Sequence, residues 1–345
     1  MTVKSPARIE AERLCKRFPA VPTMTLAKKL AKSHKKTIET ARSLLRIIRG
    51  NTGDKARRQT TGKDSYRPPQ PAGFTPEMPK SLAEPWLPFD LGNGHRTVIL
   101  SDIHLPYHSP IALQATVKYF KKLKPDNVLI NGDLMDWYGL SRYQKDPSKV
   151  DFNAEIDSGS EFLAWMRSVF PNCRIIYKFG NHDERWKIWV FNNAPLLEKL
   201  PKKMRIIAYE CLVGLMEHVL ECKNHGIETV KDQRPVMLGH LPVLHGHESG
   251  KAGLTSSVNA ARGLFLKTLS TMLASHGHRT SQHSETDWRH KQTSTWSTGC
   301  LCELNPPYWR MGNRWNWGAA FVDVDSVGGF NVENFRIGPN GEIWK

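Results

Sequence analysis

The hydrophobic positions after residue 95 form short runs that each end in a polar cluster. Apolar segments at 96–100 (RTVIL), 125–130 (PDNVLI) and 173–179 (CRIIYKF) have the length and the β-branched content of buried strands. Between them, the segments 109–124 and 159–170 repeat apolar residues at the spacing of amphipathic helices. Strands that alternate with helices predict an α/β core.

The first 50 residues show helical periodicity and many basic positions. The segments 5–18, 26–33 and 35–50 are predicted helices, separated by a Pro-rich break and a short turn. In the third segment the apolar positions Ile38, Ala41, Leu45 and Ile48 form one face, and the basic positions Lys35, Arg42, Arg46 and Arg49 form another. A helix, a short turn and a basic helix together predict a small all-α, helix-turn-helix-like module.

The net charge of +16 is concentrated in the first 70 residues, which contain 18 Lys and Arg against 5 Asp and Glu. A polyanion such as DNA or RNA is the natural partner for this end of the chain. A solvated basic face on a three-helix cap is the alternative interpretation. Seven prolines between residues 51 and 90 predict an extended segment. We therefore expect a basic helical module at 1–52, a Pro-rich linker or arm at 53–92 and an α/β domain at 93–345.

The composition of the 345 residues, 39% hydrophobic and 24% charged, is typical of a soluble globular protein. No apolar run approaches the roughly 18 residues of a membrane span, and no apolar signal segment follows Met1, so we expect a cytoplasmic protein without a membrane partner. Six scattered cysteines favour reduced thiols. Only Cys300 and Cys302 are close in sequence; a lone C-x-C is a weak zinc signature, and packing is the favoured interpretation.

Carboxylate, amide and imidazole side chains follow five of the predicted strands. They are Asp102 and His104; Asp133 and Asp136; Asn181, His182 and Asp183; His245 and His247; and His276 and His278. Each cluster alone is compatible with an ordinary turn. Because functional groups gather at the carboxyl ends of strands in α/β folds, the five together predict a single metal site. Mixed oxygen and nitrogen ligands suit Mn, Fe or Zn better than Mg or Ca.

In order along the chain, the motifs D-x-H, G-D-x-x-D, G-N-H-D, H-G-H and H-x-H resemble those of the calcineurin-like metallophosphoesterases, over about residues 96–285. The resemblance implies a two-layer β-sandwich flanked by helices, with two divalent metal ions bridged by an aspartate. Manganese is the expected metal, with iron or zinc as alternatives. A basic helical head, a Pro-rich arm and this domain are together similar to metallophosphoesterases encoded by bacteriophages, which implies action in the cytoplasm of a bacterial host.

The resemblance also implies a role for each motif residue. One metal would be held by Asp102, His104 and His278, the other by Asn181, His245 and His276, with Asp133 as the bridge. A hydroxide that bridges the two metals would attack the phosphorus in line. His182 would protonate the leaving oxygen, and Asp183 would orient its imidazole. The alternative for both residues is an ordinary turn position.

Three features depart from the family pattern. Ser275 replaces the glycine that usually opens the last motif. His247 competes with His245 for one ligand role. Because the first histidine of H-G-H is the family's ligand, His247 is left as a substrate contact or as a group that supports the ligands. The arginine that follows the second motif in protein Ser/Thr phosphatases is missing, which argues against that class; Arg185 and Arg279 are the candidates for phosphate contact.

These observations predict a two-metal phosphoesterase that acts on DNA or RNA, as a nuclease or an end-processing enzyme. One alternative is a phosphatase or phosphodiesterase for nucleotides or small phosphoesters. Another is a non-catalytic DNA-binding accessory protein, although a structural metal site would have no need of the His182–Asp183 pair. The sequence leaves the oligomeric state open.

Overall fold

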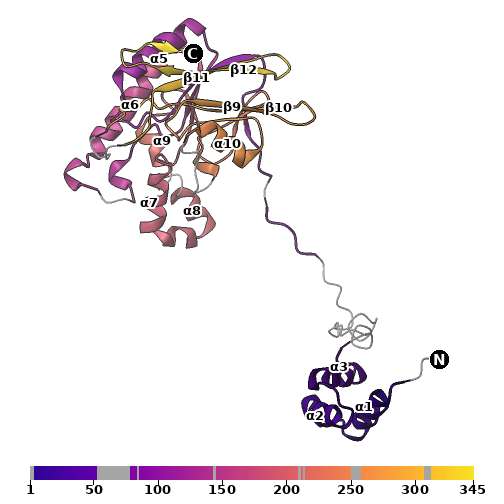
Figure 1. Cartoon of the computed structure of the whole chain (residues 1–345). Coiled ribbons are helices and arrows are strands. Elements are labelled where there is room, and N and C mark those ends of the chain that lie inside the picture. The colour runs from indigo at the N-terminus through magenta and orange to yellow at the C-terminus, as the bar shows by residue number, and fades with distance from the viewer. Residues whose placement is uncertain are drawn as a thin grey trace. The chain divides into compact units, whose positions relative to one another are not determined.

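The computed structural model describes residues 4–52, 78–83, 85–142, 145–208, 211–212, 214–249, 258–306 and 312–345. The chain divides into two compact units, Met1–Ala83 and Glu84–Lys345 (Figure 1). Most of the predicted Pro-rich arm, residues 53–77, lies outside the described residues. Across the described residues, no helix is both long and apolar enough to cross a membrane.

The N-terminal unit contains α1 (Pro6–Arg17), α2 (Thr23–Ser33) and α3 (Ile38–Ile48). Side chains from all three helices form one apolar cluster, which includes Leu14, Leu30 and Leu45. The three predicted helices are therefore present, and their short lengths make packing against one another the main source of their stability.

The start of α3 differs from the pattern-based prediction. The Thr37 hydroxyl oxygen accepts a hydrogen bond from the Thr40 N–H at 3.2 Å, so Thr37 caps the helix and Ile38 is its first residue. Lys35 consequently lies in the turn before α3 and does not share a helical face with Arg42 and Arg46. Ile38, expected on the apolar face, is 45% exposed because it lies at this first position.

The second unit is built on a seven-stranded mixed sheet in the order β13-β12-β11-β2-β3-β4-β5. Its strands are β2 (His95–Leu100), β3 (Asn127–Asn131), β4 (Arg174–Lys178), β5 (Ile227–Val230), β11 (Gly318–Val324), β12 (Phe330–Ile337) and β13 (Ile343–Trp344). The strands β2 to β5 are parallel neighbours, while β11 pairs antiparallel with both β2 and β12. The β11–β12 pair confirms the hairpin predicted at the end of the chain.

A second sheet of six strands has the order β1-β6-β7-β8-β10-β9. Its strands are β1 (Phe89–Asp90), β6 (Val236–Leu238), β7 (Leu241–Leu244), β8 (Met272–Ala274), β9 (Ser281–Thr286) and β10 (Gln292–Ser297). β1 pairs with β6, so this sheet extends into the segment assigned by sequence to the Pro-rich arm.

Helices connect and cover the two sheets (Figure 1). The α-helices are α5 (Pro110–Leu123), α6 (Phe152–Val169), α7 (Arg185–Asn193), α8 (Lys202–Ala208), α9 (Leu215–Val219) and α10 (Ala260–Thr268). The 3₁₀ turns are η1 (Tyr138–Leu140), η2 (Pro147–Lys149), η3 (Pro195–Lys199) and η5 (His247–Ser249).

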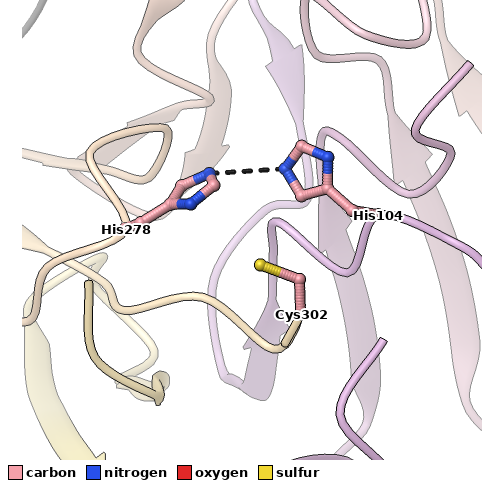
Figure 2. Close-up of side chains that lie close together, drawn as sticks. All are labelled: His104, His278 and Cys302. Atoms are coloured by element: carbon pink, nitrogen blue, oxygen red, sulfur yellow. Dashed lines mark hydrogen bonds between the residues drawn. The ribbon is translucent and has the colours of Figure 1, made fainter. Parts of the chain in front are cut away.

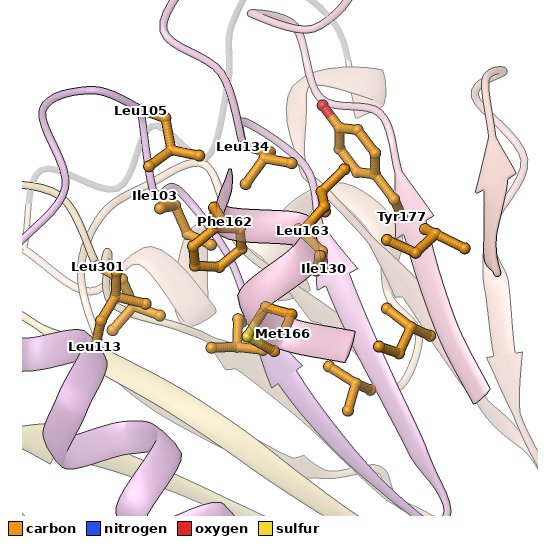
Figure 3. Packing of buried hydrophobic residues seen from close by; sticks show 14 of the residues in the cluster. Ile103, Leu105, Leu113, Ile130, Leu134, Phe162, Leu163, Met166, Tyr177 and Leu301 are labelled. Carbon is orange, nitrogen blue, oxygen red and sulfur yellow. The ribbon is translucent and has the colours of Figure 1, made fainter. Parts of the chain in front are cut away.

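Alternating side chains of the central strands supply two separate cores, because successive residues of a strand point to opposite faces. Val98 and Leu100 of β2 join the cluster that contains Phe162 and Met166 of α6 (Figure 3). Ile99 joins a different cluster, which contains residues of both sheets and therefore lies between them. This arrangement is the predicted two-layer β-sandwich with flanking helices.

The topology brings the predicted site residues to the carboxyl ends of neighbouring parallel strands in both sheets. β2, β3 and β4 are parallel, so their carboxyl ends lie side by side, and the same holds for β7 and β8. The five polar clusters follow these five strands. The sequence pattern therefore placed the five polar clusters correctly at the ends of strands.

Candidate metal centre

Side chains from both sheets meet at these strand ends. The His278 Nε2 atom lies 2.9 Å from Asp102 Oδ1 and 3.3 Å from His104 Nε2. On the other side, His245 Nε2 lies 3.2 Å from Asp133 Oδ2. Residues separated by up to 176 positions in the chain are thus in direct contact, as the resemblance to a metal centre requires.

Within the described part of the chain, three groups of side chains place potential ligand atoms within 4.8 Å of one another. The groups are His104, His278 and Cys302; His104, Asp133 and His182; and Asp133, His245 and His276. His104 and Asp133 each belong to two of them, and of these only the carboxylate of Asp133 has two oxygens with which to bridge two cations. Cys302 had been interpreted as a packing residue, and its presence here was not predicted.

Two glycines allow the motif loops to approach closely. A Cβ atom on Gly180 would lie 2.3 Å from Asp133 Oδ1, and one on Gly132 would lie 2.3 Å from His245 Nδ1. Both distances are far below van der Waals contact, so any larger residue would push a carboxylate or an imidazole away. The glycine of G-N-H-D, Gly180, is therefore required by packing, whereas Gly132 also has a positive φ angle of 84°.

The backbone is strained at five of the predicted metal ligands. The φ angles are 52° for Asp102, His104 and Asp133, 64° for His276 and 51° for His278. A left-handed conformation in a residue with a side chain costs of order 1–3 kcal/mol and persists only where the surroundings impose it. Its concentration in one small region is typical of a functional site.

Buried charges dominate the electrostatics of the centre. Burial alone would raise the pKa of the Asp133 carboxyl, but His245, His182 and His104 outweigh burial and hold it well below its usual range. Burial also opposes the charged form of His245, yet Asp133 and Asp102 raise its pKa to about 10. Imidazolium groups thus balance the carboxylates here, a role that a divalent cation fills more fully.

The donor set fits divalent cations. Asn181 Oδ1 is buried without a hydrogen-bond partner among the described residues, and Asp102 Oδ1 has only its ion-pair contact with His278 Nε2. Buried oxygen atoms without a partner are unusual and often belong next to an ion or a water molecule. The carboxylates, and the imidazoles once a cation displaces their extra protons, suit first-row transition metals.

The structure corrects the sequence-based assignment of the residue that orients His182: Asp136, and not Asp183, contacts its imidazole. His182 Nδ1 donates to the Asp136 backbone oxygen at 2.8 Å and lies 3.3 Å from Asp136 Oδ1. Asp136 also accepts a hydrogen bond from His104 Nδ1 at 2.9 Å. Burial raises the pKa of Asp136, but these imidazoles outweigh it and keep the carboxyl ionised.

Asp183, to which that orienting role had been assigned, faces the backbone instead. Its Oδ2 accepts hydrogen bonds from the N–H groups of Asp133 and Gly180, both at 2.8 Å, and its Oδ1 accepts from the Met135 N–H at 3.2 Å. Burial and the nearby Asp133 raise the pKa of Asp183 to about 6 in spite of these bonds. The carboxylate therefore joins the β3 and β4 loops, and its direction is set by backbone donors that a sequence pattern does not reveal.

The candidate phosphate contacts lie at different points around the centre. Arg185 donates to His182 Nε2 at 2.9 Å and to the Asp136 backbone oxygen at 2.7 Å. The His247 ring lies 5.4 Å from the His245 ring, with Nε2 3.4 Å from Glu184. Arg279 directly follows His278 and is partly exposed. Of the three, Arg185 has the best-defined position next to a predicted catalytic group.

The structure also explains the unusual serine of the last motif. Ser275 is fully buried, and its hydroxyl oxygen accepts hydrogen bonds from Asn131 Nδ2 at 2.8 Å and Thr298 Oγ1 at 2.9 Å. These bonds join the ends of β3, β8 and β10. The replacement of glycine therefore adds connections without displacing His276, whose N–H donates to Asp102 Oδ2 at 3.1 Å.

A buried ion pair next to the centre was missed by the sequence analysis. Lys178 Nζ lies 2.9 Å from Glu248 Oε1, and both side chains are almost fully buried. Glu248 also accepts hydrogen bonds from the N–H groups of His245 and Gly246. A lysine inside the apolar run of β4 and a glutamate directly after H-G-H were the available signals.

In the N-terminal unit, the four predicted nucleic-acid contacts differ from one another. Lys35 and Arg46 are exposed, and Arg42 Nη1 lies 3.5 Å from Glu39. Arg49 donates hydrogen bonds to the backbone oxygens of Phe18 and Val21 and to the Thr23 hydroxyl, so its guanidinium holds the helices together. Arg49 is accordingly a poor candidate for a phosphate contact.

Comparison with known proteins agrees with the geometry. The family model of calcineurin-like phosphoesterases matches residues 95–294. The Gene 54 protein of Mycobacterium phage L5 is 25% identical over 270 residues, which cover 72% of this chain and 98% of that protein. The Gene 54 protein of Mycobacterium phage D29 is 26% identical over 271 residues, with the same coverage.

Among solved structures, vacuolar protein sorting 29 from Cryptosporidium parvum and its Chaetomium thermophilum counterpart are similar at 11% identity, with TM-scores of 0.36 and 0.34. Each comparison covers 72% of this chain and 94% of the other.

Proposed function

The chain belongs to the calcineurin-like phosphoesterase family of metal-dependent hydrolases, and on that premise we propose that it cleaves phosphate esters of nucleic acid. The observation that carries this proposal is the meeting of five motifs at one buried centre, with Asp133 shared between two ligand groups. A purely structural role would not require strained ligands from both sheets.

The residues that would hold two divalent cations are those of the five motifs. Asp102, His104 and His278 would hold one cation, and Asn181, His245 and His276 would hold the other, with Asp133 between them. When bound, two such cations neutralise phosphate oxygens and make water more acidic. Manganese is the first choice for an oxygen- and nitrogen-rich site, with iron or zinc as alternatives.

The chain's own side chains supply the proton. His182 is held by Asp136 at Nδ1, which leaves Nε2 to carry a proton toward the leaving oxygen. Arg185 donates to that Nε2 atom in the structure, so a phosphate oxygen would offer Arg185 an alternative acceptor. Arg185 would then bind the substrate and release His182 for proton transfer.

The basic N-terminal unit supports a nucleic-acid substrate. Lys35 in the turn before α3 and Arg42 and Arg46 on α3 supply positive charge, and phosphate contacts of this kind give affinity without sequence preference. The enzyme would act as a nuclease or on the ends of DNA or RNA.

A second candidate substrate is a nucleotide or another small phosphoester, and a cavity favours it. This cavity of about 400 Å³ is lined by Trp137, Trp186 and Trp189 and by apolar side chains of α6 and α9. Arg185 connects it to the centre through a hydrogen bond to the Trp137 backbone oxygen at 3.3 Å. Stacking on an aromatic side chain contributes about 1–3 kcal/mol per base, so a nucleobase would fit here.

One set of assays tests both candidates. The manganese-loaded full chain should cleave bis(p-nitrophenyl) phosphate and DNA or RNA oligonucleotides, and Asp133→Asn should not. Hydrolysis of nucleotides alone would favour the second candidate. A metal-loaded protein that cleaves none of these esters would reject the enzymatic proposal.

A further inference from the structure

Cys302 occupies a fixed position inside the candidate metal centre. It is 2% exposed, and its sulfur points toward the space between His104 and His278 (Figure 2). The backbone is held on both sides, since Cys302 pairs with His108 in an isolated bridge and its oxygen accepts a hydrogen bond from Trp317 Nε1 at 2.8 Å. The sulfur is therefore placed by the fold and not by a free loop.

We propose that Cys302 is a thiolate ligand of the cation held by Asp102, His104 and His278. The proposal rests on the metal centre inferred above and adds sulfur to a set of oxygen and nitrogen ligands. It concerns which metal the centre selects, a property that the motif residues leave open.

The distances agree with a shared ion. Potential ligand atoms of His104, His278 and Cys302 lie within 4.8 Å of one another. Bonds of about 2.0–2.1 Å to nitrogen and 2.3 Å to sulfur allow two ligands of one ion to be up to about 4.4 Å apart. Only a small adjustment of side chains would bring the three atoms onto one cation.

A second observation also points to a ligand at this place. Asp102 is fully buried, and its Oδ1 atom has no hydrogen-bond partner among the described residues although it lies 2.9 Å from His278 Nε2. The Asp102 backbone oxygen accepts a hydrogen bond from the Leu301 N–H, next to Cys302, at 3.0 Å. The Asp102 carboxylate and the Cys302 sulfur thus come from segments that are hydrogen-bonded to each other.

Binding would break the S–H bond of Cys302 and form a metal–sulfur bond, with the proton released to solvent. Thiolates favour zinc, iron and cobalt over manganese and magnesium. The cation next to Cys302 should therefore be a softer metal than its neighbour, which has only oxygen and nitrogen ligands.

Cobalt(II) provides a readout that does not depend on turnover. The full chain, stripped with a chelator and loaded with Co²⁺, should show a near-ultraviolet sulfur-to-cobalt charge-transfer band. Cys302→Ser should lose this band. Cys300→Ser is the comparison variant and should keep the band. Cys300 is equally buried and contacts both His278 and Cys302, but its thiol donates to the Asn316 backbone oxygen at 3.6 Å.

The possible outcomes separate this proposal from the proposed function. Cobalt bound at equilibrium dialysis without a charge-transfer band, or with a band lost only in Cys300→Ser, overturns the role of Cys302 and leaves the metal centre in place. Absence of any cobalt binding overturns both.

Zinc binding gives an independent measurement. If Cys302→Ser does not fold by circular dichroism, Cys302→Ala takes its place. In the folded variant, Zn²⁺ affinity should fall at least about tenfold, the lower end of the loss seen when a supporting ligand contact is removed. Mn²⁺ affinity should change less, and an equal loss for both metals would reject a thiolate ligand.

Discussion

The N-terminal helical unit and the candidate metal centre are both rich in charged side chains, but the first keeps most of them exposed and the second buries them. Lys35 and Arg46 are exposed, whereas Asp102 and Asp133 are at most 1% exposed. In water, charges interact weakly and are screened by salt; in a buried site each interaction is several times stronger. Substitutions in the N-terminal unit should therefore have small, salt-dependent effects on stability and affinity. Substitutions in the centre should have large effects on activity that do not depend on salt.

The largest effect is expected from Asp133→Asn. This change keeps the size of the side chain but removes the charge that contacts His245 and would bridge the two cations. Loss of several kcal/mol of charge stabilisation should reduce hydrolysis about 1,000-fold, in low and high salt alike. Asp323→Asn, an exposed carboxylate on β11, is the control for steady-state assays. A loss of only a few fold would mean that Asp133 does not bridge the metals.

A pH-dependent change in stability is expected from Glu155 on α6. Burial and the charge of Asp136 raise the pKa of Glu155 to about 7 from its ordinary value of 4.5. The unfolded chain thus loses this proton at lower pH than the folded protein, so stability should fall as pH rises from about 4.5 to 7. The difference reaches at most about 3 kcal/mol.

Glu155→Gln should remove this loss of stability at rising pH, because Gln carries no charge and can still accept the hydrogen bond from the Tyr138 N–H. Urea denaturation of chelator-treated protein at pH 5 and pH 8 would measure the change in the free energy of unfolding. Glu161→Gln, exposed on the same helix, should leave the pH dependence unchanged. An identical pH dependence in Glu155→Gln and the wild type would show that Glu155 is ionised in the folded protein.

Asp136→Asn tests how His182 is positioned. Because Asp136 contacts both His104 and His182, the variant should lower kcat about 10–100-fold, the usual range for a supporting contact. It should also shift the pH profile, because it removes a negative charge 3.3 Å from His182 Nδ1. Full activity with an unchanged pH profile would argue that the His182 position does not depend on Asp136.

Smaller effects are expected in the N-terminal unit, where Arg49 and Arg46 should behave differently. Arg49→Ala removes hydrogen bonds to two backbone oxygens and should destabilise the helices by about 1–2 kcal/mol. Arg46→Ala should change stability by less than about 0.5 kcal/mol. Thermal unfolding of the helical signal would compare them, and equal losses would contradict the distinction.

The smallest effects per residue are expected in the affinity for nucleic acid. Replacing Lys35, Arg42 and Arg46 by alanine should reduce the slope of log affinity against log salt by about 0.9 for each residue that contacts duplex phosphate. Fluorescence anisotropy with labelled DNA in chelator would measure this slope. Lys121→Ala with Lys122→Ala, exposed on α5, should leave it unchanged. An unchanged slope in the triple variant would remove these residues from the interface.

The sequence by itself determined the parts of this protein that depend on pattern and order. Alternating strands and helices gave the α/β core, and the five motifs marked which strand ends carry the site. Parallel strands must bring their carboxyl ends together, so convergence followed from topology. The location of positive charge in the first 70 residues is likewise a property of the chain alone.

Only the tertiary structure decided which partners meet within that frame. Asp136 and not Asp183 holds His182, Arg49 turns inward while Arg46 does not, and Cys302 reaches the centre from a loop after β10. Each outcome depends on a separation of a few ångströms between segments that are distant in sequence. Hydrogen bonds and metal ligation fail beyond such distances, and spacing along one chain does not report them.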